Sequence, residues 1–322
     1  MLEQDEVIKP EKIPVGVSSC LLGERVRYDG GHKGHSYITG TLHEYFDYQP
    51  FCPELNIGLG VPRKPIRLQR ADADLIRCVQ IDDASIDHTQ SLRDCADEQR
   101  TWQSKLCGYI VKKDSPSCGM ERVKVWQDAM PVRSGSGVYT QRMLQNFPFL
   151  PVEEEGRLGD AVLRENFIQR VFALRRWHHL MESLTVGSLI EFHARHKLIL
   201  MSRNQSRYRK LGQFVAAINQ DNLEAKSAEY LLEFMALLKI SATRKHHVNV
   251  LQHIQGYLKK NLDSDDKQEL AQSIEKYRLG LVPIVVPITL LNHHFRRHPD
   301  AYITDSYYMS PYPEELCLQN TI

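Results

Sequence analysis

The sequence predicts an α/β N-terminal domain with a mainly parallel sheet, followed by an all-α C-terminal domain. Up to about residue 155, short apolar runs alternate with amphipathic stretches and with turns rich in glycine or proline. From about residue 160 onward, long segments have helical periodicity instead. With 322 residues, of which 42% are hydrophobic, the chain can bury two cores. We expect boundaries at 1–160, 161–186 and 187–322, with the middle segment as a helical connector.

The strands of the first domain are expected where apolar, β-branched runs end in turn residues. These runs cover 13–17, 67–81 with a turn near Ala71, 107–111 and 147–152, the last ended by the acidic run 153–155. Charge and periodicity predict helices at 39–46, 87–106 and 138–145. A flexible glycine-rich loop at 135–137 precedes the last of them. This alternation of strands and helices favours a largely parallel sheet.

The second domain is predicted to be helical throughout. A long amphipathic helix over 160–184 leads into it, and a capping box of Ser188 and Glu191 is expected to open a helix that ends near residue 201. Further helices are expected at 208–219, 223–238, 243–262 and 265–279, and Gly280 ends the last of these. An apolar segment between two prolines and one more helical stretch, with residues 293–297, follow.

The overall charge of +1 conceals an asymmetry between the two halves. Residues 187–299 contain seventeen Lys and Arg against ten Asp and Glu, a balance of +7, which leaves −6 for the rest of the chain. A basic helical domain indicates either a polyanionic partner or a helical surface whose lysines are merely solvated. Charge alone leaves both alternatives open.

Neither a membrane span nor a secretory signal is expected. No segment has the apolar length that crosses a bilayer, and residues 1–12 lack the apolar core of a signal peptide. The seven cysteines are an odd number, which favours a reducing compartment where thiols stay free to bind metal or react. We therefore expect a cytoplasmic protein without a membrane partner.

Three cysteines share one setting, a loop at the end of a strand. Cys20 follows the run 13–17, and Cys118 follows the strand at 107–111 across a Ser-Pro-Ser turn. Cys52 follows an aromatic residue and is fixed by Pro53. Open α/β sheets keep their chemistry at the carboxyl ends of the strands, so the three thiols form a candidate site there.

The ligand chemistry of these cysteines has two interpretations. Thiolates are soft ligands for zinc, copper(I) and iron–sulfur clusters, and the sequence lacks the paired C-x₂₋₄-C spacing of zinc sites. Three isolated cysteines suit a [4Fe-4S] cluster with three Cys ligands and one open iron that can bind a substrate atom. The alternative is that the three are buried core thiols. Spacing alone leaves both open.

Acid–base groups stand beside these cysteines. Glu54 lies two residues after Cys52, and Ser115 and Ser117 lie just before Cys118. A carboxylate can act as a general base, and hydroxyls with neighbouring backbone N–H groups can stabilise developing negative charge. The same residue types also form caps and turns, which is the structural alternative.

A polar, glycine-rich segment at 25–33 is predicted to be a loop that can close over a ligand, because paired glycines disfavour a helix. Arg25, Arg27 and Lys33 can contact phosphate, and Tyr28 can stack on a base; an ordinary surface loop is the alternative. The Gly-x-Gly at 58–60 lacks the third glycine of a dinucleotide fingerprint and precedes two prolines. No dinucleotide cofactor is expected.

Residues 13–155 resemble the thiouracil desulfidase family of [4Fe-4S] proteins. The resemblance rests on four motifs in order, which are Ser19-Cys20-Leu21-Leu22-Gly23, Arg27-Tyr28-Asp29-Gly30, Cys52-Pro53-Glu54 with Gly60-Val61-Pro62-Arg63, and Ser115-Pro116-Ser117-Cys118-Gly119. Residues 187–306, around Phe192-His193-Ala194-Arg195-His196-Lys197-Leu198, are similar to an uncharacterised all-helical module often fused to that domain. The two-domain form resembles the bacterial RNA 4-thiouridine desulfidases.

The resemblance also implies roles for the site residues. It makes the three loop cysteines the cluster ligands, Glu54 the base or proton shuttle, and one of Ser115 and Ser117 the oxyanion or ring-contacting group. The cysteines outside the motifs are treated as structural, namely Cys78, Cys95, Cys107 and Cys317. A soft thiocarbonyl sulfur suits an open iron, and water activated by Glu54 would replace that sulfur, so that the net reaction is hydrolytic.

The leading hypothesis is an enzyme that removes sulfur from 4-thiouridine in RNA, with thiolated tRNA as its partner. The alternatives are action on free thiouracil or thiouridine nucleotides, and a cluster-bearing RNA-binding regulator without turnover. Glu54 favours turnover, because a sensor has no use for a carboxylate beside an open iron. The basic helical domain is predicted to grip the RNA backbone, unless it is a dimerisation module. The candidate RNA contacts are Arg203, Arg207, Lys210, Arg244 and Lys245.

Overall fold

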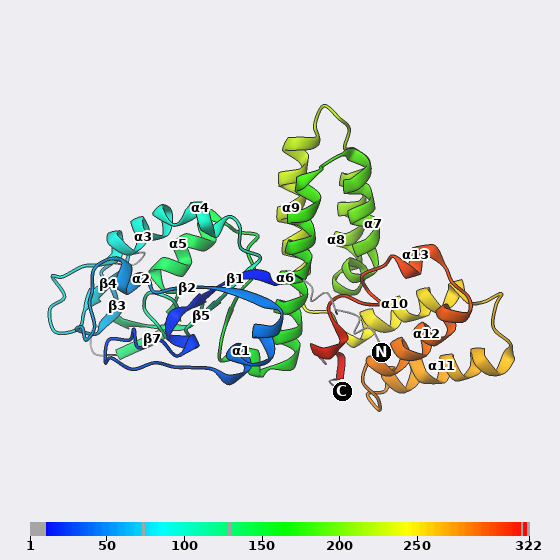
Figure 1. Ribbon diagram of the computed structural model, residues 1–322, viewed down its shortest axis with the longest axis horizontal. Coiled ribbons are helices and arrows are strands. Elements are labelled where there is room, and N and C mark those ends of the chain that lie inside the picture. Colours follow the sequence, from blue (N-terminus) through cyan, green and yellow to red (C-terminus); the bar gives the residue numbers. More distant parts are fainter. Residues whose placement is uncertain (1–10, 73–74, 128–129, 317, 321–322) are drawn as a thin grey trace, which may run out of the picture. The chain divides into compact units, whose positions relative to one another are not determined.

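The computed structural model describes residues 11–72, 75–127, 130–316 and 318–320. It divides into two compact units, one up to residue 159 and one from residue 160 onward. The first unit contains strands and helices, and the described residues of the second are helical (Figure 1). The predicted fold classes are therefore confirmed for both halves.

The first sheet has four parallel strands in the order β2-β1-β5-β8. They are β2 (Phe46–Phe51), β1 (Ile13–Ser18), β5 (Gly108–Val111) and β8 (Val152–Glu154). Val15 lies opposite Tyr48 on one side and Gly108 on the other. The two central strands are almost wholly buried, as expected of short apolar runs covered on both faces. This sheet is the frame that positions the site.

A second sheet of four strands, in the order β4-β3-β6-β7, lies in the same unit. Its strands are β3 (Ile66–Arg70), β4 (Ile76–Gln80), β6 (Val123–Gln127) and β7 (Met130–Gly135). Two antiparallel pairs, β3 with β4 and β6 with β7, are joined by the parallel pairing of β3 with β6. A buried cluster holds this sheet to the helices α3 (Thr89–Glu98) and α5 (Val138–Asn146), and it consists of Leu68, Cys78, Leu92, Val123, Val125 and Val138.

Several boundaries of the first unit differ from the prediction. The helix expected at 39–46 is two short turns, α1 (Ser36–Thr39) and η2 (Thr41–Glu44), because Phe46 already begins strand β2. The strand expected at 147–152 begins only at Val152, and the acidic run that was expected to follow it supplies two strand residues. The helix expected over 87–106 is divided into α3 and α4 (Arg100–Gln103). The antiparallel pairing of β6 with β7 was not predicted.

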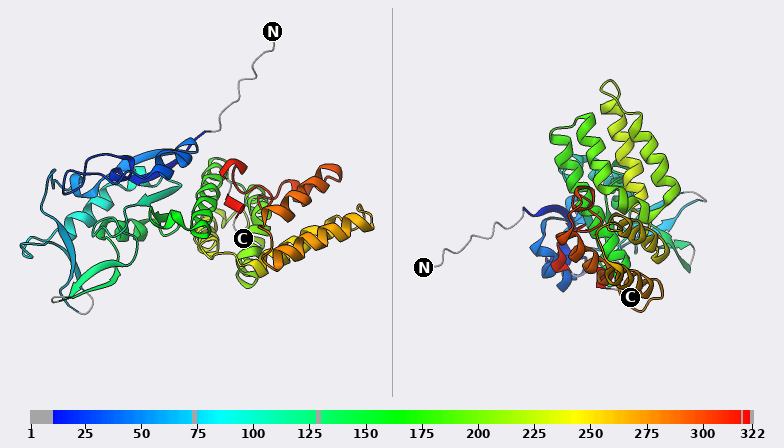
Figure 2. Two further views of the ribbon diagram at one scale, coloured as in Figure 1. Left: turned by 90° about the horizontal axis from the view of Figure 1, so that it is seen from below. Right: turned by 90° about the vertical axis from the view of Figure 1, so that its right-hand side faces the viewer.

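The second unit contains seven helices of twelve or more residues among the described residues. They are α6 (Ala161–Glu182), α7 (Val186–Arg203), α8 (Gln205–Ala216), α9 (Leu223–Leu238), α10 (Arg244–Tyr257), α11 (Ser264–Arg278) and α12 (Val285–Arg297). The short helix α13 (Ala301–Thr304) follows. Helices α7, α8 and α9 pack together, and α11 packs against α12 (Figures 1 and 2).

Local chemistry explains the ends and the core of these helices. Asp160 caps α6 by accepting from two backbone N–H groups. The capping box of α7 consists of Thr185 and Ser188, not Ser188 and Glu191 as predicted, so the helix begins three residues earlier. Trp177 stacks on Tyr230 in a buried aromatic core.

Within the described part of the chain, no helix combines the length and the apolar character that crossing a membrane requires.

Candidate functional site

The site lies at the carboxyl edge of the first sheet. Because its four strands are parallel, the loops that follow β1, β2, β5 and β8 emerge at one edge. The loops after β1, β2 and β5 line an open cavity of about 560 Å³. Cys20 reaches it from η1 (Ser19–Leu22), Cys52 from the turn before α2 (Pro53–Asn56), and Cys118 from the loop after β5. The three predicted cysteines thus line one cavity.

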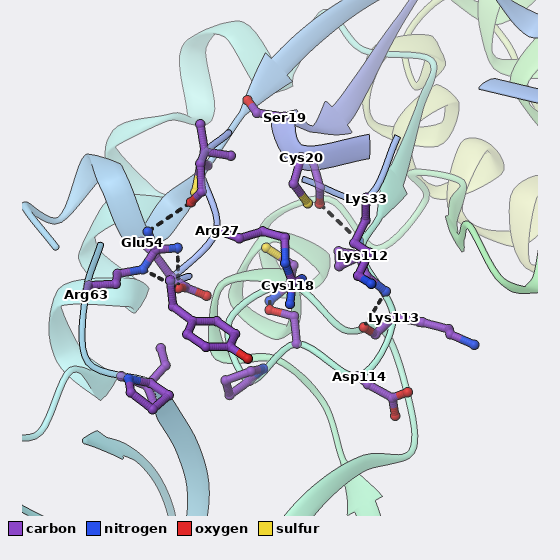
Figure 3. Close-up of a pocket in the computed structure, with 18 of the residues that line it drawn as sticks. Ser19, Cys20, Arg27, Lys33, Glu54, Arg63, Lys112, Lys113, Asp114 and Cys118 are labelled. Atoms are coloured by element: carbon purple, nitrogen blue, oxygen red, sulfur yellow. Dashed lines mark hydrogen bonds and ion pairs between the residues drawn. The ribbon is translucent and has the colours of Figure 1, made fainter. Parts of the chain in front are cut away.

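Figure 3 shows how the side chains face this cavity. Cys20 and Cys118 lie near its centre, with Glu54 and Arg63 on one side and Lys112 on the other. Cys20 and Cys118 are each only 8% exposed, and Cys52 is half-buried. The thiols are therefore largely sheltered from bulk water, and basic side chains such as Arg27, Lys33 and Lys112 also line the cavity.

The thiols influence one another's acidity. Burial, followed by the neighbouring Cys52, raises the pKa of Cys20 to about 11. Burial also raises the pKa of Cys52, and it raises the pKa of Cys118, where both other cysteines add to the effect. Burial therefore favours the protonated thiols, and holding all three as thiolates would require a positively charged group beside them.

The arrangement of the three thiols does not match a site for one metal ion. Among the residues that the structure describes, no three Cys, His, Asp or Glu side chains lie close enough together to bind one metal ion. The three sulfur atoms that line the cavity are soft donors, which favour soft metals or an iron–sulfur cluster.

Glu54 is held in place by two neighbours. It lies in the first turn of α2, and its Oε2 accepts from Nε of Arg63 at 2.8 Å and from Nη2 of Arg63 at 2.7 Å. Its Oε1 accepts from the hydroxyl of Ser117 at 2.6 Å. Arg63 thus holds one carboxylate oxygen through two nitrogens and Ser117 holds the other, which fixes the position of the carboxylate.

The two predicted serines have different positions. Ser117 is fully buried, whereas Ser115 lines the cavity. Their Oγ atoms lie 3.0 Å apart, and Ser115 Oγ also accepts from the backbone N–H of Cys118 at 3.1 Å. A hydroxyl has one proton, and Ser117 donates its own to Glu54, so Ser115 is the donor of the pair. The hydroxyls thus form a chain from the cavity to the carboxylate.

The glycine-rich loop contributes three of its four candidate residues to the cavity. Arg27, Tyr28 and Lys33 line it, whereas Arg25 is exposed and is not among the lining residues. The guanidinium of Arg27 lies over the ring of Tyr28, 5.4 Å from its centroid, and pairs with Asp29 at 3.5 Å. The predicted loop therefore lies where it can contact a ligand.

Sequence reasoning missed several residues that hold the site together. Lys112 forms an ion pair with Glu155, whose other carboxylate oxygen accepts from the backbone N–H of Lys113 at 2.7 Å. Ser18 Oγ accepts from the backbone N–H of Lys112 at 3.0 Å. The signal for Glu155 was the triple acidic run after a predicted strand. All three of these glutamates are buried, which only partners at the sheet edge explain.

The cysteines that were treated as structural lie elsewhere. Cys78 and Cys107 are fully buried, and Cys95 is 2% exposed with its Sγ 3.0 Å from Oδ1 of Asn56. None of these three lines the cavity. Cys317 lies outside the described residues.

The basic residues predicted to contact RNA divide into two groups. Arg203 is only 7% exposed, and it donates to the carbonyl of Ile240 and to Gln169. This burial contradicts its predicted contact with an RNA backbone, because a phosphate cannot reach a guanidinium inside a helical core. Arg244 is half-buried, donates to the carbonyl of Tyr277 and stacks on its ring.

The other three basic residues remain accessible. Arg207, Lys210 and Lys245 are exposed. Arg207 and Lys210 line a shallow groove on α8 and α9.

The fold and the site together define a class of protein. It is an α/β protein in which three thiols and a hydrogen-bonded carboxylate converge at the carboxyl edge of a parallel sheet. The profile of the 2-thiouracil desulfurase family matches residues 15–155, and that of a protein of unknown function, DUF1722, matches residues 197–313. The chain belongs to the 2-thiouracil desulfurase family, in the form that continues into a DUF1722 module.

Two individual relatives were found. The uncharacterized protein YbgA of Escherichia coli (strain K12) is 38% identical over 154 residues, which are 47% of this chain and 91% of the relative. A solved structure, described as the [4Fe-4S]-dependent thiouracil desulfidase TudS, is 27% identical and covers 46% of this chain and 95% of its own, with a TM-score of 0.38.

Proposed function

We propose that this protein removes sulfur from 4-thiouridine in tRNA, giving uridine and hydrosulfide. The observation that carries the proposal is the cavity of the desulfurase domain, where three thiols face a carboxylate fixed by Arg63 and Ser117. In the proposed reaction a water oxygen replaces sulfur on the pyrimidine carbon, and sulfur leaves as hydrosulfide. No external oxidant or reductant is consumed.

We propose that Cys20, Cys52 and Cys118 hold a [4Fe-4S] cluster with one open iron. A cluster binds each thiolate through a different iron, so its ligands surround a larger space than those of one ion. Three thiols that line one cavity of about 560 Å³ from separate loops fit that requirement. When bound, the cluster would supply a soft Lewis acid for the thiocarbonyl sulfur.

Glu54 is the proposed general base. Its carboxylate accepts from three donors, so a water hydrogen-bonded to it is held at a fixed position beside the thiols. Removing a proton from that water makes the oxygen nucleophilic enough to attack the pyrimidine ring. Arg63 supports the negative charge of the base before the proton arrives.

Ser115 is the proposed substrate-contacting hydroxyl, and Ser117 the connecting one. Ser115 lines the cavity. Its Oγ accepts from the N–H of Cys118 and gives its own proton to Ser117, which leaves one lone pair to accept from a donor in the cavity. Ser117 lies behind it, between Ser115 and Glu54. A proton can therefore pass between the cavity and the carboxylate along the two hydroxyls.

The tRNA part of the proposal rests on charge. Arg27, Lys33 and Lys113 line the cavity, where they can meet the phosphates on either side of a thiolated nucleotide. The basic helical module adds exposed Arg207, Lys210 and Lys245 as candidate backbone contacts. Free thiouracil carries no phosphate and would not need either set.

The test compares two substrates on charge-reversed variants of the full chain. We expect the pair Arg207→Glu and Lys210→Glu to lose at least tenfold in kcat/KM on thiolated tRNA and to keep wild-type activity on free 4-thiouracil. The control pair Lys259→Glu and Lys260→Glu, also exposed, changes the net charge equally. Equal losses on both substrates, or equal losses in both pairs, would exclude a specific RNA contact at α8.

A further inference from the structure

Arg63 connects two parts of the site that are far apart in sequence. Its side chain is 7% exposed, and its Nε and Nη2 both donate to Oε2 of Glu54. Its third nitrogen, Nη1, donates to the carbonyl of Val26 at 2.9 Å and to that of Gly60 at 3.0 Å. One guanidinium thus binds the proposed base, the glycine-rich loop and its own turn at once.

The backbone of Arg63 binds the same loop. Its N–H donates to the carbonyl of Tyr28 at 2.9 Å. Among the residues that the structure describes, the hydrogen bonds that leave residues 24–31 are these two, and both end on Arg63. The remaining bonds of the segment, such as Gly30 N–H to the carbonyl of Arg27, stay inside it. The tip of the loop is therefore held against the site by this one residue.

We propose that Arg63 is a positioning residue that couples closure of the loop at 24–31 to the placement of Glu54. The proposal rests on the function proposed above and adds a specificity step to it. A substrate that contacts Arg27 and Tyr28 stabilises the closed loop, and the closed loop stabilises the guanidinium orientation that holds the carboxylate. A ligand that does not engage the loop leaves the base less well placed.

The planar fork of arginine is essential to this coupling. Four contacts, two to Glu54 and one each to Val26 and Gly60, use all three nitrogens of the guanidinium. A lysine ammonium carries the same charge but cannot reach these acceptors together. Arg63→Lys should therefore keep the charge beside Glu54 and still lose the coupling. Arg63→Ala removes both and keeps only the backbone bond to Tyr28.

The first test measures the loop without requiring turnover. Hydrogen–deuterium exchange is followed in the full chain, with and without iron and sulfide loaded. We expect amides of residues 24–31 to exchange at least tenfold faster in Arg63→Ala and Arg63→Lys, with the core strands unchanged. Arg67→Ala is the matched control, because Arg67 is also partly buried and contacts Gln69 and Trp126 instead of the loop. Unchanged loop exchange, or the same increase in the control, would overturn the proposal.

The second test separates positioning from structural support. We expect Arg63→Lys to lower kcat by about 10–100-fold, the scale of a misplaced catalytic group, and to raise KM for tRNA. Added guanidinium should partly restore kcat in Arg63→Ala. Glu54→Gln should lower kcat while its loop exchange stays at the wild-type rate. A wild-type kcat in Arg63→Lys would contradict the proposed positioning of Glu54 by Arg63. If the wild type released no hydrosulfide, the proposed function would be contradicted instead. The exchange experiment would still show whether Arg63 holds the loop at 24–31.

Discussion

Replacing Glu54 by Gln changes one charge and almost no volume. The carboxylate now receives three hydrogen bonds, two from Arg63 and one from Ser117. A glutamine can keep its oxygen toward Arg63 and present its amide nitrogen to Ser117, whose hydroxyl then turns to accept. The cavity should therefore keep its shape, and the three cysteines should be undisturbed.

Two magnitudes follow from this geometry. The guanidinium of Arg63 is only 7% exposed, so losing its ion-pair partner should cost about 1–3 kcal/mol of folding stability, with the remaining hydrogen bond limiting the loss. Losing a general base should lower turnover by about 10²-fold or more. A general loss of fold would instead reduce turnover and cluster content together.

The assay reconstitutes the full chain anaerobically with iron and sulfide, then measures cluster absorbance, substrate affinity and hydrosulfide release. We expect wild-type absorbance and affinity in Glu54→Gln, with the rate reduced as stated. Glu44→Gln, an exposed glutamate in the same unit, is the matched control and should behave as wild type. A near-wild-type rate in Glu54→Gln would refute the assignment of the base, since water would then be activated elsewhere.

Three other outcomes are expected. Alanine at Cys20, Cys52 or Cys118 should abolish cluster absorbance and activity, whereas alanine at Cys78, Cys95, Cys107 or Cys317 should leave the cluster in place; full iron content in any of the first three would remove that residue as a ligand. Ser115→Ala should raise KM as well as lower kcat, because this hydroxyl lines the cavity. Ser117→Ala should lower mainly kcat, because this hydroxyl is buried. Identical effects of the two variants on both parameters would contradict the proposed chain of two hydroxyls. Affinity for tRNA should fall steeply with salt, and the double reversal Arg207→Glu and Lys210→Glu should reduce the log–log slope by about two; an unchanged slope would place the phosphate contacts elsewhere.

The cysteine site could be predicted because its signal is local. Each loop follows a strand, and the parallel sheet brings the loops to one edge. For β1 and β5 the strand was visible as an apolar run. A strand before Cys52 was expected but its range was not predicted, because Asp47, Gln49 and Pro50 interrupt the pattern of β2, which an edge strand tolerates. Cys52 was found from its proline and glutamate instead.

Other features could not be predicted because they depend on tertiary contacts. Arg63 lies nine residues from Glu54 and 37 from Val26, and no periodicity predicts either contact. Counting charges treated Arg203 as solvated, although it lies in the helical core. The acidic run at 153–155 indicated a turn by composition, yet its glutamates are buried against Lys112, Arg157 and backbone N–H groups.

The most direct test of the account is the product of a single turnover by the reconstituted full chain. Thiolated tRNA and free 4-thiouracil are offered in parallel, and hydrosulfide and the desulfurised base are quantified for each. We predict one hydrosulfide per uridine formed in tRNA, with a single-turnover rate on tRNA well above that on the free base. Uridine formation without hydrosulfide, or no loss of sulfur from either substrate by protein with a full cluster, would contradict it.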